Sequence, residues 1–145
     1  MIRKSLWVVL LAIGGGATWF AVSSFAQDKP QLTAVRAAPN FVHTVIFHLK
    51  TDAPAGAAEG LIADAHELLR PIPSVRDLKV GRPAEKGTPD LAKKDYQVAL
   101  VVLFDNQAGL ETYLKHPLHL KYVEKHGQHI DRDKLVVYDF VNQRK

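Results

Sequence analysis

The chain contains no cysteine, so disulfide bridges, thiolate zinc sites and thiol catalysis are excluded. It also lacks a nucleophilic serine motif, a phosphate-binding loop and the glycine fingerprint of dinucleotide-binding folds. No internal repeat or low-complexity tract is present among the 145 residues. A chain without covalent cross-links must be stabilised by its hydrophobic core.

The sequence also lacks a strong excess of charge of one sign. Lys and Arg number 19, Asp and Glu number 15, and the two kinds are interleaved. A nucleic-acid-binding surface would need a basic stripe with aromatic residues between the charges, and the sequence has none. We therefore expect no nucleic-acid partner.

Residues 1–26 have the pattern of a secretory signal peptide. Arg3 and Lys4 form a basic start, an almost entirely apolar stretch follows, and Ala26 ends a small-residue cleavage signal before Gln27. Without this segment 17 basic residues remain against 15 acidic ones, a net charge of +2. The pattern predicts a periplasmic or secreted protein.

An uncleaved membrane anchor is the alternative for the same segment. The uncharged stretch from Ser5 to Gln27 is 23 residues long, and about 20 apolar residues are enough to cross a bilayer. The run Gly14-Gly15-Gly16 weakens such a helix, which favours cleavage. If the anchor is kept, the domain still lies outside the cytoplasm, and only this segment contacts the membrane.

Residues 27–40 are interpreted as a linker, and residues 41–142 have the size of one domain. Hydrophobic alternation predicts four strands, at 41–50, 74–82, 95–105 and 135–141. Helical periodicity appears between the first two strands and again between the last two. The order β-α-β-β-α-β predicts an α+β, ferredoxin-like domain with a four-stranded antiparallel sheet.

The first helix is expected to have Asp52 as its N-cap, with Pro54 in its first turn, and to end before Pro71. Its spacing of apolar residues is typical of a helix that packs one face on a sheet. The stripe consists of Ala58, Leu61, Ile62, Ala65, Leu68 and Leu69.

The third strand is apolar on both faces. Its alternate residues form two apolar sets, Val98, Leu100, Val102 and Phe104 on one face and Ala99, Val101 and Leu103 on the other. Two helices cover only one face of a four-stranded sheet, and monomers rarely expose a large apolar patch. We therefore expect a second copy to pack against the other face, which gives a symmetric homodimer.

The segment Tyr113-Leu114-Lys115-His116-Pro117-Leu118-His119 holds the densest proton-transfer chemistry in the sequence. Pro117 is incompatible with a continuous helix, so one helix is expected to end at His116 and another to begin with His116 as its N-cap. The bend would bring Tyr113 and His119 to one side. The helix N-terminus would keep His119 neutral, so that it can act as a base beside the phenol. The alternative is that His116 only caps a helix and His119 only fills a half-buried position.

These elements together resemble the stress-responsive A/B-barrel family, also called the dimeric alpha+beta barrel (Dabb) domain. The His-Pro-x-His element at 116–119 is the most specific part of the resemblance. The resemblance implies a ferredoxin-like subunit and a dimer whose sheets form a barrel. It rests on residues 41–47, 72–81, 95–105, 113–119 and 135–140.

The family includes a polyketide cyclase whose catalytic tyrosine and histidine lie in a Tyr-x-x-His-Pro-x-His segment. The resemblance therefore implies catalytic roles for Tyr113 and His119. A pocket histidine in the first strand of that enzyme matches His43. This chain departs from the cyclase at Val98, where the enzyme has a further pocket histidine.

We expect Tyr113, His119 and His43 to converge on one apolar pocket per subunit, suited to a flat or partly aromatic ligand. The expected ligand-binding residues are Val45, Val98, Leu100 and His116. His126 and His129 are three residues apart, but no carboxylate is obviously placed with them, so we expect no metal site. No distinctive cofactor motif is present, and we expect no cofactor.

Three functions are compatible with this pattern. The first is an exported homodimer that binds a small apolar or aromatic molecule. The second is a lyase- or cyclase-type enzyme in which Tyr113 and His119 transfer protons on an enolisable carbonyl compound, with His43 assisting. The third is a non-catalytic interaction module. A cavity between sheet and helices separates them, because an enzyme needs open space beside Tyr113.

Overall fold

Four antiparallel strands form one sheet in the computed structural model, which describes residues 37–143. They are β1 (Phe41–Phe47), β2 (Asp77–Gly81), β3 (Val98–Phe104) and β4 (Val136–Val141). Their order across the sheet is β2-β3-β1-β4, so β1 lies between β3 and β4. The predicted α+β, ferredoxin-like fold is confirmed.

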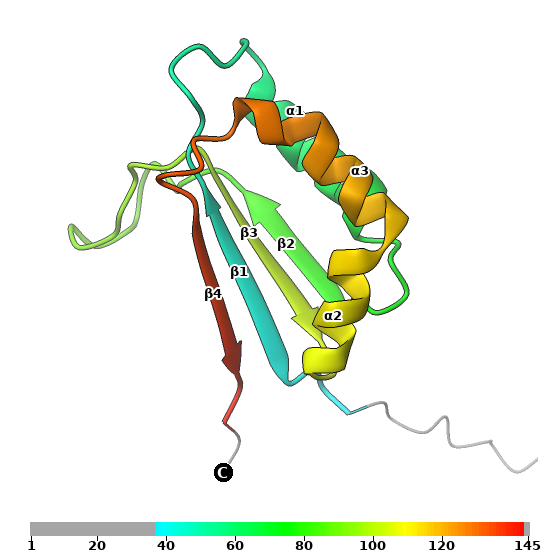
Figure 1. The fold of residues 1–145 in the computed structure, drawn as a ribbon. Coiled ribbons are helices and arrows are strands. Elements are labelled where there is room, and N and C mark those ends of the chain that lie inside the picture. Colours follow the sequence, from blue (N-terminus) through cyan, green and yellow to red (C-terminus); the bar gives the residue numbers. More distant parts are fainter. Residues whose placement is uncertain (1–36, 144–145) are drawn as a thin grey trace, which may run out of the picture. The chain divides into compact units, whose positions relative to one another are not determined.

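The helices lie on one face of this sheet (Figure 1). Between β1 and β2, α1 (Ala57–Asp64) continues directly into a π-helical segment, η1 (Ala65–Leu69). Between β3 and β4 the chain forms α2 (Gln107–Lys115), α3 (Pro117–His126) and a short 3-10 turn, η2 (Gly127–His129). α3 contacts both α1 and η1, so the helices from the two connections form a single layer over the sheet.

The first helix begins later than predicted. Its N-cap residue is Gly56 rather than Asp52, and no side chain caps the helix. Pro54 lies in a turn before the helix, where its carbonyl accepts a hydrogen bond from the Ala57 amide. Gly56 has φ of 86°, a conformation that glycine adopts without strain, and this redirects the chain from the turn into the helix.

Three strands are shorter than their apolar patterns predicted. β1 ends at Phe47, β2 begins at Asp77 and β3 begins at Val98, each three residues inside the predicted range. Beyond β1, Leu49 forms only an isolated bridge with Ile130. A residue belongs to a strand only where a neighbouring strand pairs with it, and alternation of side chains does not show where that pairing ends.

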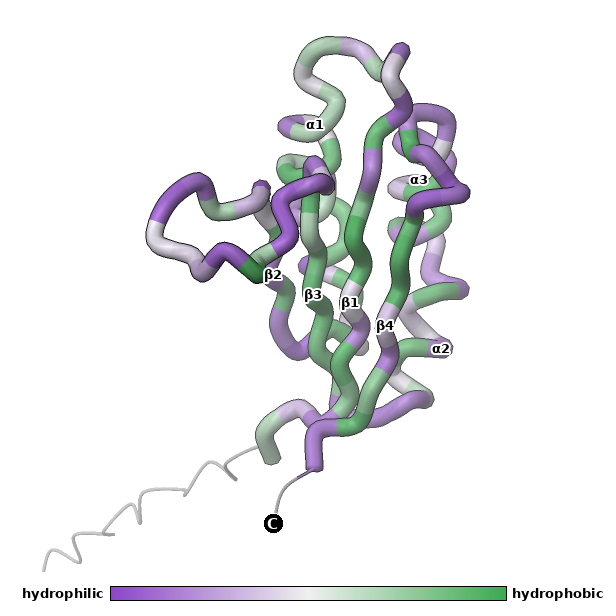
Figure 2. The backbone as a smooth tube through the Cα atoms, turned by 90° about the vertical axis from the view of Figure 1, so that its left-hand side faces the viewer, coloured by the Kyte–Doolittle hydropathy of each residue, from purple (hydrophilic) through white to green (hydrophobic). Residues whose placement is uncertain are grey.

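The core lies between the sheet and the helices. β3 alternates between buried residues that face the helices and half-buried residues, Ala99, Val101 and Leu103, that face away. On the same outward face of β4, Tyr138 and Phe140 are 61% and 50% exposed. Figure 2 looks onto this outward face and shows hydrophobic residues along β1, β3 and β4. The subunit therefore leaves one apolar sheet face uncovered by its helices.

Within residues 37–143, no helix is long and apolar enough to cross a membrane. The predicted signal peptide or anchor at 1–26 and the linker residues 27–36 lie outside the described residues.

Candidate functional site

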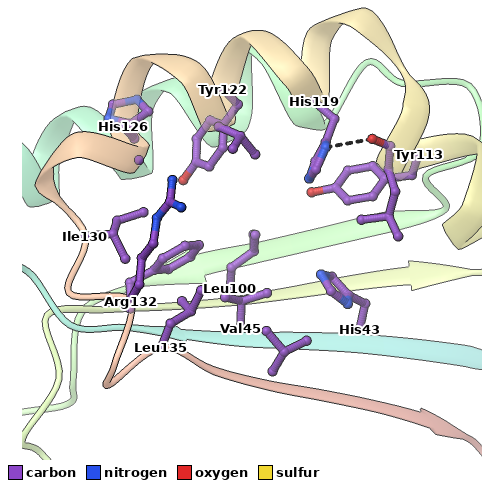
Figure 3. A pocket seen from close by; sticks show the side chains of 15 residues that line it. His43, Val45, Leu100, Tyr113, His119, Tyr122, His126, Ile130, Arg132 and Leu135 are labelled. Atoms are coloured by element: carbon purple, nitrogen blue, oxygen red, sulfur yellow. Dashed lines mark hydrogen bonds between the residues drawn. The ribbon is translucent and has the colours of Figure 1, made fainter.

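A cavity of about 450 Å³ lies between the sheet and the helices α2 and α3 (Figure 3). Its wall is mostly apolar, with polar side chains gathered at two ends. The lining residues are His43, Val45, Phe47, Leu100, Tyr113, Leu114, His119, Tyr122, Val123, His126, Gly127, Ile130, Arg132, Leu135 and Val137. There is thus open space beside Tyr113, as a binding site or an active site requires.

The helix break predicted at Pro117 is present. The Asn106 side chain caps α2 by accepting a hydrogen bond from the Gly109 amide at 3.1 Å. His116 then adopts an extended backbone, and its Nδ1 accepts a hydrogen bond from the Leu118 amide at 3.2 Å. Pro117 is the first residue of α3, so its missing N–H leaves no helical hydrogen bond unmade.

The break places His119 against Tyr113. The two ring centroids are 4.5 Å apart, and the ring planes are tilted by 55°. His119 Nδ1 lies 3.1 Å from the carbonyl oxygen of Leu114. Because a carbonyl oxygen can only accept, Nδ1 carries the hydrogen, and Nε2 of the neutral ring keeps its lone pair.

Burial decides the protonation state of both rings. Desolvation lowers the pKa of His119; the hydrogen bond to Leu114 opposes this, and nearby His43 adds to it. Burial raises the pKa of Tyr113, which is only 1% exposed. Within the described residues no hydrogen bond engages the Tyr113 hydroxyl. At neutral pH the site therefore offers an unprotonated imidazole next to an intact phenol, a base beside a hydrogen-bond donor.

His43 completes this end of the cavity. Its Nδ1 lies 2.6 Å from Oδ1 of Asp139, its register partner on β4. The carboxylate accepts, so Nδ1 donates and Nε2 is the free acceptor when the ring is neutral. The His43 and Tyr113 rings meet edge to face with centroids 6.1 Å apart. We call Tyr113, His119 and His43 the Tyr113 end of the cavity.

The predicted ligand-binding residues divide into two groups. Val45 and Leu100 line the cavity, whereas Val98 and His116 do not. Val98 is fully buried opposite Phe47, whose side chain forms the wall there. His116 uses its ring to cap α3, so capping rather than ligand contact is the role that its geometry shows.

Sequence reasoning missed the other polar end of the cavity, which we call the Arg132 end and which comprises Tyr122, His126 and Arg132. His126 Nε2 lies 2.6 Å from Oδ2 of Asp64 on α1, and both side chains are buried. The Tyr122 hydroxyl donates to the Leu61 carbonyl at 3.1 Å. These contacts connect α3 to α1.

The sequence contained a helical spacing that could have revealed two residues of the Arg132 end. Tyr122 and His126 follow His119 by three and seven residues, the spacing of one face of a helix. Asp139 was also detectable, as a charged residue on the same strand face as Val137. His126 was considered only as a metal ligand, and the described residues contain no group of three or more metal-ligating side chains.

The fold and the cavity together define a class: α+β, ferredoxin-like domains with an apolar chamber between sheet and helices. Within that class, the chain belongs to the Stress Responsive A/B Barrel Domain (Dabb) family, which matches residues 41–142. No curated protein matches the chain.

Solved structures share the fold. A dimeric ferredoxin-like protein of unknown function from Thermobifida fusca YX is 20% identical, with a TM-score of 0.60 over 72% of this chain and 92% of that one. A Dabb family protein from Mesorhizobium loti MAFF303099 is 24% identical, with a TM-score of 0.57 over 74% and 100%. A hydroxynitrile lyase from Passiflora edulis is 18% identical, with a TM-score of 0.56 over 74% and 98%.

Proposed function

We propose that this Dabb protein is exported, forms a homodimer and binds a small apolar or aromatic molecule in the cavity between the sheet and α2–α3. The observation that carries this proposal is the cavity itself, about 450 Å³ with an apolar wall and polar groups at its two ends. This volume and this lining are typical of small-molecule sites.

Ligand binding can be tested with two tryptophan substitutions on β4. Val137 lines the cavity and Val141 does not, although both lie on the same strand face and both are 46% exposed. Val137→Trp should fill part of the cavity and weaken binding of 1-octanol by about tenfold or more, whereas Val141→Trp should leave it unchanged. Isothermal titration of the full chain measures both. Equal binding to both variants would place the ligand outside this cavity.

The homodimer proposal rests on the uncovered sheet face, which is apolar on β3 and exposes Tyr138 and Phe140 on β4. The Thermobifida fusca neighbour is described as dimeric, which supports the same arrangement. Val101→Asp should shift the chain to monomer by light scattering, since burying an unpaired charge costs several kcal/mol. Leu120→Asp, on an exposed part of α3, is the control and should leave the dimer intact. A wild-type monomer at micromolar concentration would remove the proposal.

Export is supported only by the pattern of residues 1–26. N-terminal sequencing of the protein from its own host should give a start at or near Gln27. A start at Met1 in the membrane fraction would favour the anchor, and recovery from the cytosol would contradict both.

The geometry of the Tyr113 end favours a second candidate, proton transfer on an enolisable carbonyl compound. His119 Nε2 would take the proton from the carbon beside the carbonyl group, and the Tyr113 hydroxyl would donate a hydrogen bond to the oxygen on which negative charge develops. His43, held by Asp139, places a second imidazole against the phenol.

Deuterium exchange tests this candidate without knowledge of the natural substrate. The wild-type chain should accelerate exchange at the carbon next to the carbonyl of 2-nonanone in D2O, followed by NMR. Tyr113→Phe and His119→Ala should both return the rate to that of buffer, because each removes one half of the pair. His66→Gln changes an exposed histidine and should retain the wild-type rate. A wild-type rate equal to that of buffer would dismiss this candidate for ketones and leave ligand binding standing.

A further inference from the structure

Arg132 gives the cavity a permanent positive charge at the end farthest from His43. It lies in the turn between η2 and β4 and lines the cavity together with Gly127 and His126. Figure 3 shows Arg132 and His43 at opposite ends of the group of lining side chains. All other lining residues are apolar, aromatic, glycine or histidine, so Arg132 carries the one charge on the wall that does not depend on pH.

Gly127, the first residue of η2, lies beside the guanidinium group of Arg132. A Cβ atom added at Gly127 would lie 3.7 Å from Nη2 of Arg132, in van der Waals contact with it. The start of η2 and the guanidinium group are thus immediate neighbours at this end of the cavity.

The carboxylates of Asp64 and Asp131 already have other partners. Asp64 is held by Lys125 and His126, and Asp131 by Lys134 at 3.2 Å. Within residues 37–143, Arg132 forms no hydrogen bond or ion pair. The Arg132 side chain is exposed, so its charge is solvated and available to an incoming anion.

An apolar part of the cavity wall separates the two polar ends, and the spacing of the lining residues gives its length. Along β1, His43 and Phe47 both line the cavity four residues apart, which corresponds to about 13 Å. Along α3, His119 and His126 also both line the cavity. They are seven residues apart, which corresponds to about 10 Å along the helix. A ligand that contacts both ends therefore needs an apolar body of roughly this length.

We propose that Arg132 binds the carboxylate of an amphipathic acid whose apolar body fills the cavity and reaches the Tyr113 end. This inference rests on the proposed ligand-binding function and names its ligand class. The planar guanidinium fork matches the two oxygens of a carboxylate, whereas a neutral ligand leaves the fork unused. One arginine fork fits a carboxylate better than a phosphate, whose third oxygen would have no cationic partner here.

Matched ligands and matched variants test the assignment. Isothermal titration of the full chain near neutral pH should show octanoate binding about tenfold tighter than 1-octanol. Arg132→Gln should weaken the affinity for octanoate about tenfold and leave the affinity for 1-octanol unchanged. The affinity of Arg132→Lys for octanoate should lie between those of the wild type and Arg132→Gln, because lysine keeps the charge and lacks the planar fork. Arg82→Gln is the control, since Arg82 pairs with Glu59 away from the cavity.

Each outcome decides the matter. If octanoate and 1-octanol bind the wild type equally, or if Arg132→Gln keeps the preference for octanoate, the assignment to Arg132 is wrong while ligand binding in the cavity stands. If neither compound binds, the inference and the proposed function fall together. Tighter binding of octyl phosphate than of octanoate would overturn the choice of carboxylate.

Discussion

Two histidine–aspartate pairs border the same cavity, and they differ in what surrounds them. His43 Nδ1 and Asp139 Oδ1 are 2.6 Å apart, as are His126 Nε2 and Asp64 Oδ2. The Asp139 side chain is 41% exposed, whereas the Asp64 side chain is only 10% exposed. The first pair joins two neighbouring strands, and the second joins α1 to α3.

The two pairs also differ in the groups that their side chains contact. Burial alone would raise the pKa of Asp64, but hydrogen bonds from Lys125 and His126 outweigh it, and the pKa lies below its usual value. Asp64 is therefore an ionised carboxylate with two partners inside the helical layer. Asp139 instead has an open side and holds His43 against Tyr113. The same two residue types thus join α1 to α3 at one end of the cavity and hold an imidazole against a phenol at the other.

The largest expected effect on stability comes from removing the carboxylate of one pair, Asp64 or Asp139, at a time. Asp64→Ala should lower the free energy of unfolding by about 3 kcal/mol, because it leaves buried His126 without its partner. Asp139→Ala should cost about 1 kcal/mol or less, since that carboxylate is partly solvated. Urea unfolding of both variants measures the two values. Equal losses would end the distinction between the two pairs.

The buried tyrosines at the two ends of the cavity, Tyr122 and Tyr113, should also differ in how much their hydroxyl groups contribute to stability. Tyr122→Phe should cost about 1 kcal/mol, because its hydroxyl donates to the buried Leu61 carbonyl. Tyr113→Phe should leave stability nearly unchanged, because no described residue accepts a hydrogen bond from its hydroxyl. Thermal unfolding of the two variants against the wild type checks the difference. A clear loss of stability in Tyr113→Phe would give that hydroxyl a structural role.

The smallest expected effect is a pH dependence at the Tyr113 end. Burial holds the pKa of His119 below the usual histidine value of about 6.5 in the folded protein, so the unfolded chain binds the proton more readily. The contribution of His119 to stability is then complete above about 6.5 and is lost as the pH falls through the folded pKa.

Comparison with His119→Gln isolates this contribution, because the other histidines titrate in both proteins. Between about pH 7.5 and about pH 5.5, the wild type should lose a few tenths of a kcal/mol more than the variant. Urea unfolding at the two pH values provides the measurement. If the variant shows the same pH dependence, His119 does not titrate with the depressed pKa that its burial implies.

The sequence was sufficient for the fold because local patterns decide it. Alternation along β3 and the proline at 117 each act over a few residues, so the strand and the helix break were both predictable. Where the pattern depended on a distant partner, prediction was less accurate. β1 ends at Phe47 because its pairing with β3 ends there, and the alternation of side chains in β1 does not show that limit.

For the candidate site, the sequence by itself determined the Tyr113 end. Pro117 fixes the position of the helix break across which Tyr113 and His119 meet, and the alternation of β1 fixes the face of His43. Only the tertiary structure decided that Asp139 holds His43, that Asp64 holds His126 and that Arg132 reaches the cavity. These contacts join residues far apart in the chain, and no local periodicity encodes which distant side chains the packing of helices on the sheet brings within hydrogen-bond reach.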